Sequence, residues 1–582
     1  MAEHLRLTHE RVDDIPLLVG LSGQVSLPEV LDRHLGTHGH HQGLSNGWLA
    51  TVWLAFILSE GDHRKSSVQD WADRHQQTLE RLLGQPIRSG LEFNDDRLGI
   101  VLHRLSKDTA WEALEAELWQ STLAVYDLEL SRVRLDSTTS YGYHAPTDGG
   151  LMQRGHSKDH RPDLPQLKLM AAAAEPAGHL LATAVHPGQA ADDPLYTPLI
   201  QRVRHHLGRT GLLYVGDSKM AALATRAELV AGGDAYLMPL PQSAEPAAQW
   251  AAWIEAAVAA GQPVAPGGGG DADDQDDAAN LGGGYELTRS LSATVAGQPV
   301  AWTERVQVLR SPTLARRQTE QLERRLTKAA AAIWALTPAP GRGRRQHRAE
   351  ASLAAAVAQV LARFDVAGLL TIAWQRQETT RTHYVGRGRG GSQRPTRTDV
   401  DVRYAITAVE RAAAAIAGQT ARLGWRILVT NRPAATLPLA QTVAHYRGGW
   451  RLERIFHLLK DRPLGLSPLY VRRDDQIRGL TRLLTLAVRL QTLLETQTRR
   501  GLAEADEELA GLYPGQPQRT TARPTATRLL TAIAHAEITL TRLDRGPQPL
   551  WHLTPLPSLL ERVLTCLGLS PSLYHRLAEN SS

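Results

Sequence analysis

The sequence predicts an α/β protein, with a mixed-sheet core that is interrupted by a β-rich insertion and flanked by helical N- and C-terminal regions. Between residues 130 and 240, strand-like and helical runs follow the order βββαβαβ, which is typical of a sheet covered by helices. Another strand-like run, Arg426–Asn431, comes only after a long stretch of different composition. Elsewhere, apolar residues recur at helical spacing. We expect five segments, covering residues 1–126, 130–240, 241–424, 425–500 and 501–582.

Composition limits the class of protein. A chain of 582 residues is long enough for several domains, and a net charge of +5 permits nucleic-acid binding. The single cysteine, Cys566, excludes a disulfide framework and a cysteine-based zinc site. The longest apolar run, Trp48–Leu58, is too short to span a bilayer. We therefore expect a soluble intracellular protein with no membrane partner.

The two flanking segments are predicted to be mainly helical. Residues 1–126 contain four stretches with apolar residues at helical spacing, separated by short polar breaks. This region could bind DNA or serve as an accessory or dimerisation domain, because no helix-turn-helix pattern is visible. Residues 501–582 are expected to form two or three short helices joined by proline-rich breaks.

The core pattern begins at the alternating run that ends in Asp136. A turn at residues 175–178 predicts a hairpin between the next two strands. In order, the expected core elements are strand Arg132–Asp136, strands Leu167–Ala173 and His179–Val185, helix Leu195–Leu207, strand Leu212–Gly216, helix Met220–Ala231 and strand Ala235–Leu240.

The insertion is expected to mix strands and helices. Its acidic, glycine-rich part, Pro266–Gly284, is predicted to be a surface loop. Two arginine-rich loops follow, and they are either DNA contacts or solvated charge runs. The expected elements are strands Leu291–Val295 and Ala301–Leu309, helices Thr313–Ala335 and Ala351–Arg363, and strands at 368–376, 381–386 and 400–407; the loops contain Arg342, Arg344, Arg345 and Arg348, and Arg387, Arg389, Arg394 and Arg397.

The stretch Tyr446–Lys460 is predicted to be an amphipathic helix. Its one carboxylate, Glu453, has several cations near it in the sequence. This pattern fits a surface helix with ion pairs, or a metal-binding carboxylate that meets a phosphodiester. The expected apolar stripe is Trp450, Leu452, Ile455, Phe456 and Leu459, and the neighbouring cations are Arg447, Arg451, Arg454 and Lys460.

Two further carboxylates, Asp136 and Asp217, each follow a predicted strand. The end of a strand, beside a loop, is where a sheet presents ligands to a site. Carboxylates without cysteine or histidine partners are hard oxygen ligands, which suit Mg²⁺ or Mn²⁺. Asp159, Asp163 and Glu228 compete for the same role. The two aspartates lie in a polar loop with Lys158 and are more simply explained as solvated or in contact with substrate, and Glu228 is more simply a surface residue of the helix after Asp217.

Tyr446, Glu453 and Lys460 match three of the four positions of the pattern Tyr-x2-Arg-x3-Glu-x6-Lys. In this respect the chain resembles bacterial insertion-sequence transposases with a DDE triad. Residues 155–169, and the stretch that begins at Asp217, are similar to the segments that follow the two aspartates in that family. The fourth position is Gly449 here, where the family has an arginine that contacts DNA phosphate.

The resemblance implies an RNase H-like core in which Asp136 and Asp217 are neighbours. It also implies that Asp136, Asp217 and Glu453 are the catalytic metal ligands, with two Mg²⁺ or Mn²⁺ ions per site. The implied partners are double-stranded DNA, as terminal inverted repeats and as target, and a second copy of the chain, in a bacterial cytoplasm and at the nucleoid when bound to DNA. The expected DNA contacts are Tyr446, Arg447, Arg451, Lys460, Lys158, Arg387 and Arg389.

Two other functions stay open at this point. One is a stand-alone metal-dependent nuclease that cuts DNA without joining it. The other is an inactive, transposase-derived DNA-binding protein, which the departure at Gly449 keeps in view.

Overall fold

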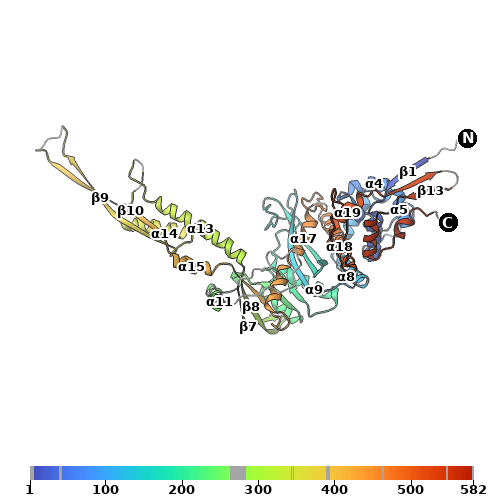
Figure 1. Ribbon diagram of the computed structural model, residues 1–582, viewed down its shortest axis with the longest axis horizontal. Coiled ribbons are helices and arrows are strands. Elements are labelled where there is room, and N and C mark those ends of the chain that lie inside the picture. The colour runs from blue at the N-terminus through green and yellow to red at the C-terminus, as the bar shows by residue number, and fades with distance from the viewer. Residues whose placement is uncertain are drawn as a thin grey trace.

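The structure is a computed structural model that describes residues 6–37, 42–261, 283–341, 344, 346–388, 393–461, 464–544 and 548–579. Figure 1 shows a broad body, which carries both chain termini at one end, and a slender arm that extends from the other end. Nearly all of the predicted acidic loop Pro266–Gly284 lies outside the described residues. In the described ranges, no helix combines the length and the apolar character needed to cross a membrane.

The helical prediction for the N-terminal region is confirmed. Its central helix, α3 (Asn46–Glu60), starts where the Ser45 hydroxyl accepts a hydrogen bond from the Trp48 amide at 3.3 Å, and it ends at Gly61 in the left-handed conformation. The apolar run of α3 is buried. Around it lie α1 (Ile15–Gln24), α2 (Leu27–Leu35), α4 (Lys65–Arg74), α5 (Gln76–Leu83), α6 (Ser89–Glu92), α7 (Asp95–Leu105) and α8 (Asp108–Tyr126).

The two ends of the chain also form a small sheet, which the sequence did not predict. β1 (Arg6–Arg11) pairs antiparallel with β12 (Thr539–Asp544), which pairs with β13 (Leu550–Leu553). The terminal regions, which were predicted to be mainly helical, therefore also contain strands. β1 is mostly exposed, so it lacks the apolar alternation that marks a strand in a sequence. The expected short helices of the C-terminal region are present as α19 (Ala526–Ala534), α20 (Ser558–Leu567) and α21 (Ser572–His575).

The large sheet has eight strands in the order β4-β3-β2-β5-β6-β11-β8-β7. β2 and β5 are parallel, as are β5 and β6, whereas β2–β3 and β3–β4 are antiparallel. This pairing, with the first core strand between the second and the fourth, is that of the RNase H-like fold, and it confirms the predicted order. The strands are β2 (Arg132–Tyr141), β3 (Gln166–Glu175), β4 (His179–Pro187), β5 (Leu213–Val215), β6 (Ala235–Pro239), β11 (Trp425–Thr430), β8 (Gln298–Arg310) and β7 (Gly283–Val295).

The sheet continues past the boundary that we expected at residue 240. β8 pairs with β11, and β7 pairs with β8 along its whole length. The first strands of the insertion therefore extend the core sheet, with β7 at its edge and β8 next to β11. β7 also begins at Gly283 instead of Leu291. Between β6 and β7 the chain forms a short 3-10 turn (Gln242–Ala244) and α11 (Ala247–Ala260).

Helices cover both faces of the sheet. Val133 and Leu135 of β2 face a core shared with α9 (Asp193–Leu207), α10 (Leu223–Ala231) and α11. Side chains alternate along a strand, so Arg134 and Asp136 point to the opposite face. That face is covered by α16 (Leu439–Arg447), α17 (Trp450–Lys460) and the long α18 (Asp474–Ala505).

The predicted helix Tyr446–Lys460 is broken. α16 ends at Arg447 and α17 begins at Trp450, with Gly448 and Gly449 between them. The prediction of one continuous helix is therefore wrong. Glycine has the highest conformational freedom and a poor helix propensity, so two in succession favour a break. Four of the five residues of the expected stripe are buried, namely Leu452, Ile455, Phe456 and Leu459, and Trp450 is half-buried.

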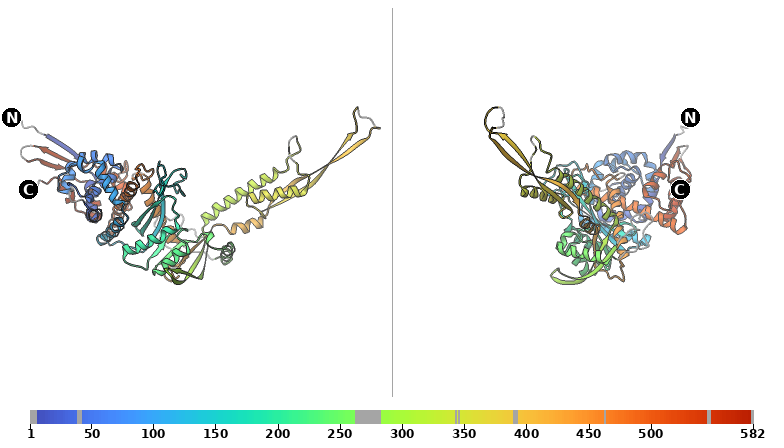
Figure 2. Two further views of the ribbon diagram at one scale, coloured as in Figure 1. Left: turned by 180° about the vertical axis from the view of Figure 1, so that it is seen from behind. Right: turned by 60° about the vertical axis from the view of Figure 1, so that its left-hand side comes forward.

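The arm consists of α13 (Pro312–Trp334), α14 (Glu350–Arg363), β9 (Leu370–Tyr384), β10 (Thr396–Arg411) and α15 (Ala413–Ala421). Figure 2 shows the two-stranded hairpin of β9 and β10 extending beyond the helices. β9 is one continuous strand, so the two strands predicted at 368–376 and 381–386 are wrong. The middle and far end of β9 are almost entirely exposed, and a strand without a buried face has no apolar alternation to reveal it.

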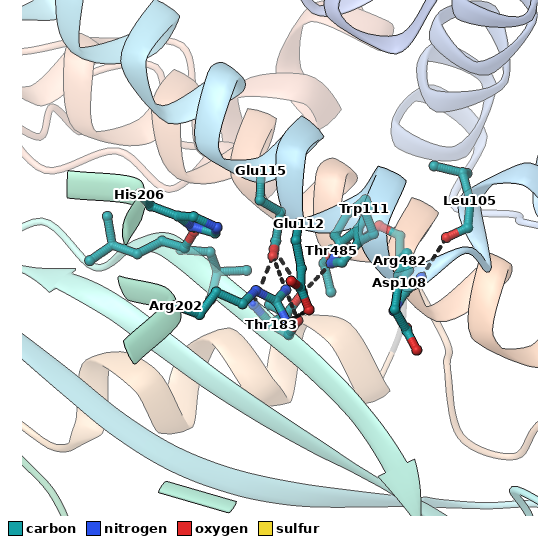
Figure 3. A network of polar contacts seen from close by, with 12 residues as sticks. Leu105, Asp108, Trp111, Glu112, Glu115, Thr183, Arg202, His206, Arg482 and Thr485 are labelled. Atoms are coloured by element: carbon teal, nitrogen blue, oxygen red, sulfur yellow. Dashed lines mark hydrogen bonds and ion pairs between the residues drawn. The ribbon is translucent and has the colours of Figure 1, made fainter. Parts of the chain in front are cut away.

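One buried polar network ties the helical region to the core (Figure 3). Glu115 of α8 forms ion pairs with Arg202 of α9 and with Arg489 of α18. The hydroxyl and the amide of Thr183 on β4 donate hydrogen bonds to the same carboxylate, at 2.8 and 3.1 Å. Four elements from three predicted segments therefore meet at one fully buried carboxylate.

Candidate active site

Asp136 and Asp217 are brought together by two neighbouring parallel strands. In the pairing of β2 with β5, Arg134 lies opposite Val215. Asp136 follows Arg134 by two positions, and Asp217 follows Val215 by two positions. Both carboxylates therefore lie at the same height along the paired strands. β5 ends at this point, and β2 continues past it. This is the arrangement that the resemblance implied.

Asp136 sits in a half-buried position with one cation on it. Its Oδ1 accepts a hydrogen bond from the Ser137 amide at 2.6 Å and lies 3.2 Å from Lys158 Nζ. Burial raises the pKa of the Asp136 carboxyl, Lys158 lowers it, and the negative charge of Asp217 raises it again, so that this pKa stands above its ordinary value. Two carboxylates that repel each other favour a cation between them.

Asp217 is held by the tyrosine hydroxyl of α9. Tyr196 donates a hydrogen bond of 2.7 Å to Oδ1, and the Lys219 amide donates to the same oxygen at 2.9 Å. Burial, followed by the charges of Asp217 and Asp136, raises the pKa of Tyr196. The raised pKa favours the protonated tyrosine, which donates to the carboxylate and orients it.

A polar loop connects Asp136 to α17. Asp159 Oδ1 lies 2.5 Å from Lys460 Nζ, and its Oδ2 accepts from the Thr139 hydroxyl at 3.2 Å. The amide of Lys158 donates to the same Thr139 hydroxyl at 3.0 Å. Thr139 and Asp159 therefore connect Lys158 in the loop to Lys460 on α17. Both lysines are predicted DNA contacts. Asp159 is occupied by an ion pair, which accounts for it without a metal.

Tyr446 lies beside both aspartates. Burial raises the pKa of its hydroxyl, Arg426 lowers it, and the charge of Asp217 raises it. Arg134 holds the end of α16, because its guanidinium donates to the carbonyl oxygens of His445 and Tyr446. Arg134 also forms an ion pair with Glu175.

The guanidinium of Arg134 also lies next to the position where the resembled pattern has arginine. A Cβ atom at Gly449 would be 3.7 Å from Nη1 of Arg134. The cation that is missing from α17 is therefore matched by one from β2. Positive charge next to Gly449 therefore does not depend on Arg447 or Arg451, the two arginines that lie close to it in the sequence.

Glu453 is not brought into a cluster with the two aspartates. It is exposed on α17. Within the described residues, no group of three or more histidine, cysteine, aspartate or glutamate side chains is placed to hold a metal ion. Glu453 does lie two helical turns from Lys460, so the two share a side of α17. Arg454, its neighbour in sequence, instead pairs with Glu495 of α18.

Residues 129–490 match the family described as the transposase DDE domain. This match covers more than half of the chain. The chain belongs to the transposase DDE domain family. No curated protein matches the chain. Among solved structures, it is similar to the cryo-EM structure of a piggyBac transposase synaptic complex with hairpin DNA, with 7% sequence identity, a TM-score of 0.32, and coverage of 90% of this chain and 80% of that chain.

The transposase DDE domain begins just before β2 and ends within α18. It therefore contains all three predicted acidic residues, Asp136, Asp217 and Glu453, together with the arm. The N-terminal helices and the residues after 490 lie outside the match. The network at Glu115 crosses this boundary, because α8 lies before residue 129 and Arg489 lies inside the domain.

The predicted DNA contacts of the transposase fall in three places. Arg447 lines a cavity beside Tyr446. Arg451 stacks on Trp450, with the guanidinium carbon 4.8 Å from the ring centre. Arg387 is exposed at the tip of the hairpin, and Arg389 lies outside the described residues.

Three residues of the site were not predicted from the sequence: Tyr196, Arg134 and Asp192. Asp192 forms an ion pair with Lys168. Ser137, next to Asp136, donates a hydrogen bond to Asp192 at 3.3 Å. Asp192 precedes a proline-containing helix start and could have been noticed as a helix N-terminal acid. Tyr196 belongs to the apolar side of α9, and nothing in the local pattern separates it from a core residue.

Proposed function

We propose that this chain is the transposase of an insertion sequence, which cuts the ends of its element and joins them to target DNA by two-metal phosphoryl transfer. The observation that carries the proposal is the placement of Asp136 and Asp217 side by side, at the ends of paired parallel strands, in a chain of the transposase DDE domain family. The pKa of Asp136, raised by burial and by Asp217, supports a site that receives a cation.

The donor set fits Mg²⁺ or Mn²⁺. Asp136 and Asp217 offer carboxylate oxygens, which these hard ions prefer, and the Lys158 ammonium group already occupies a cation position 3.2 Å from Asp136 Oδ1. Asp136 would be shared by both ions, while Asp217 and Glu453 would each bind one. When bound, the two ions would supply the activation of a water or 3′-hydroxyl and the stabilisation of the leaving oxygen.

The protein's own groups orient this site. Tyr196 holds Asp217 by its hydrogen bond, and a fixed carboxylate loses less entropy when it binds a cation. Lys158 balances the charge of Asp136 before a metal arrives, and it would then turn to a phosphate of the substrate. Tyr446 and Lys460 would position the DNA strand from α16 and α17.

Glu453 would join the set when α17 shifts. The break at Gly448 and Gly449 separates α17 from α16, and glycine pairs are common sites of helix bending. Among the described residues, the Lys460 side chain contacts the loop that carries Lys158 through an ion pair with Asp159. To turn its exposed side toward Asp136, α17 would have to break this ion pair and the one between Arg454 and Glu495, and its buried side would have to repack.

The DNA partner would be the terminal inverted repeats and the target duplex, held by two copies of the chain. Arg447 and Arg451 would contact the backbone near the site, and Arg387 at the hairpin tip would contact it at a distance. Arg389, which lies outside the described residues, would be a further contact. Guanidinium groups bind phosphate in a bidentate manner, and contacts to the backbone set position without reading sequence. The helices of residues 1–126 would recognise the element end or support dimerisation.

A second candidate is an inactive, transposase-derived DNA-binding protein. Two observations favour it: Gly449 replaces the arginine of the pattern, and the described residues contain no three-carboxylate group placed for a metal. In that case the chain would bind element ends with no requirement for metal.

The deciding experiment is cleavage of a labelled duplex that carries the terminal repeat flanking this chain's own gene, with Mg²⁺. We compare the wild type with Glu453→Ala and with Asp461→Ala, a matched exposed carboxylate at the end of the same helix. Loss of cleavage in Glu453→Ala alone, with binding intact, supports the transposase. Binding without cleavage in all three proteins supports the inactive candidate. Equal cleavage in all three removes Glu453 from the chemistry.

A further inference from the structure

A cavity of about 260 Å³ lies where the arm joins the body. Its walls come from four elements: the end of β8, the first turns of α13, β11 and the last turn of α16. Three arginines from three of these elements line it, namely Arg317, Arg426 and Arg447. The other lining residues are Leu309, Ser311, Thr313, Leu314, Leu428, Val443 and Tyr446.

The lining carries positive charge and no negative charge. No aspartate or glutamate is among the described residues that line the cavity. In the described part of the chain, neither Arg317 nor Arg426 forms an ion pair with a carboxylate. This differs from the rest of the core, where arginines such as Arg202 and Arg226 are paired with buried glutamates. A cavity with no acidic residue in its described lining, and with two arginines that have no carboxylate partner among the described residues, is typical of a site for an anion.

The cavity borders the candidate active site. Tyr446 lines it, and the hydroxyl of the same residue interacts electrostatically with Arg426 on one side and Asp217 on the other. Tyr446 therefore lies both in the cavity wall and within electrostatic range of the aspartates. The cavity lining also includes the N-terminal end of α13 at Ser311, Thr313 and Leu314, where the helix dipole adds a weak positive potential.

We propose that Arg317, Arg426 and Arg447 form a binding site for one backbone phosphate of the DNA, next to the reacting phosphodiester and on the arm side. This inference rests on the proposed function, because it takes DNA as the substrate. The site sets the path of the strand between the aspartates and the arm.

The test is the salt dependence of duplex binding without metal. Each neutralised phosphate contributes about −0.9 to the slope of log K against log salt concentration. We expect Arg317→Gln and Arg426→Gln each to lower affinity roughly 10- to 100-fold, as for the loss of a charged hydrogen bond, and to reduce the slope by about 1. The double variant should lose little more than either single variant, because both arginines serve one phosphate.

The matched control is Arg316→Gln, an exposed arginine on the same helix that does not line the cavity. Thermal unfolding should be unchanged in all variants, since Arg317 and Arg426 are exposed. Slopes for Arg317→Gln and Arg426→Gln that equal the slope for Arg316→Gln would overturn the inference. A second outcome would also overturn it: inorganic phosphate stabilises the wild type but not the double variant, while the double variant still binds the duplex as the wild type does. The cavity would then bind a free anion instead of a DNA phosphate.

This outcome is distinguishable from failure of the proposed function. The binding assay uses no metal, so it does not depend on cleavage. A wild-type chain that binds the duplex, with unchanged slopes in the variants, overturns the phosphate site alone. A wild-type chain that binds no duplex overturns the proposed function instead.

Discussion

Glu115, which contacts the edge strand β4, and Asp136, which stands on the inner strand β2, are two carboxylates of the same sheet region with opposite surroundings. Glu115 is fully buried, yet two arginines and Thr183 satisfy it (Figure 3). Burial acts to raise the pKa of Glu115, but Arg202 and Arg489 outweigh burial, and this pKa is lowered from its ordinary value. Asp136 has only Lys158 and faces Asp217, and its pKa is raised.

The difference indicates that Glu115 is a structural carboxylate, and it agrees with the proposed role of Asp136 as a metal ligand. A carboxylate with two guanidinium partners has no remaining need for a cation. A carboxylate pair with one ammonium group has an excess of negative charge that only a further cation can balance. The number of counter-charges, more than the depth of burial, separates the two roles.

The largest expected effect is on cleavage. Asp136→Asn should reduce cleavage of the terminal-repeat duplex on the order of 10⁴-fold, as for the loss of one member of a catalytic unit. Its thermal unfolding temperature should not fall, because the change removes a charge that Asp217 repels. Cleavage and calorimetry on the same preparation check both statements. Asp163→Asn, an exposed neighbour in the polar loop, is the control and should retain activity.

The next effect is on stability and concerns Glu115. Glu115→Ala leaves Arg202 and Arg489 buried without their partner, so the free energy of unfolding should fall by about 3–5 kcal/mol. Urea unfolding followed by tryptophan fluorescence measures the loss. Glu112→Gln is the matched control: Glu112 lies 3.4 Å from the same Arg202, but its side chain is 48% exposed, and such a pair contributes about 1 kcal/mol or less. Equal losses in the two variants would contradict the assignment of Glu115 as the structural carboxylate.

The parts of this comparison that could be predicted from the sequence are those with a local pattern. Alternation before Asp136 and a short apolar run before Asp217 marked two strands, and the βββαβαβ order made them neighbours. Glu115 had no such mark, because a glutamate on a helix is ordinarily a solvated residue. Its role depends on Arg489, which is 374 positions away.

The wrong predictions have the same physical origin. The pairing of β1 with β12 joins opposite ends of the chain, and the far half of β9 is a strand without a buried face. Neither the terminal strand pair nor the exposed half of β9 leaves a periodic pattern of apolar residues in the local sequence. The break between α16 and α17 was visible as Gly448 and Gly449, but the apolar residues on both sides suggested one helix. Tyr196 can be recognised only from its contact with Asp217.

A third prediction concerns the free energy of unfolding at acid pH and a histidine next to the Glu115 network. His179 is buried beside Arg489, and burial followed by this positive charge lowers the pKa of His179 from 6.5 to about 4. Between pH 6.5 and 4, His179 binds a proton in the unfolded chain but not in the folded chain, so the free energy of unfolding falls as the pH drops toward 4. The shift corresponds to about 3 kcal/mol.

This contribution can be separated from that of Glu115. The lowered pKa of Glu115 means that its stabilisation is present above the unfolded value of 4.5 and is lost only as the pH falls further, through the folded value. His179→Gln should therefore flatten the stability profile between pH 6.5 and 4, while the loss at lower pH remains. Urea midpoints across this range provide the measurement. A profile parallel to the wild type would show that His179 titrates normally in the folded protein.

The smallest expected effect is stabilisation by metal, and it tests the other side of the comparison. A ligand that binds only the folded state at 100 times its Kd stabilises by about 2.7 kcal/mol. Mg²⁺ should raise the unfolding temperature of the wild type and of Glu112→Gln equally, and it should have no effect on Asp136→Asn, in which the excess negative charge is gone. Glu453→Ala should respond like the wild type in the absence of DNA, because Glu453 lies outside the aspartate pair in this arrangement. If Glu453→Ala loses the response as well, α17 reaches the metal without DNA, and the shift that we propose for that helix occurs before the substrate binds.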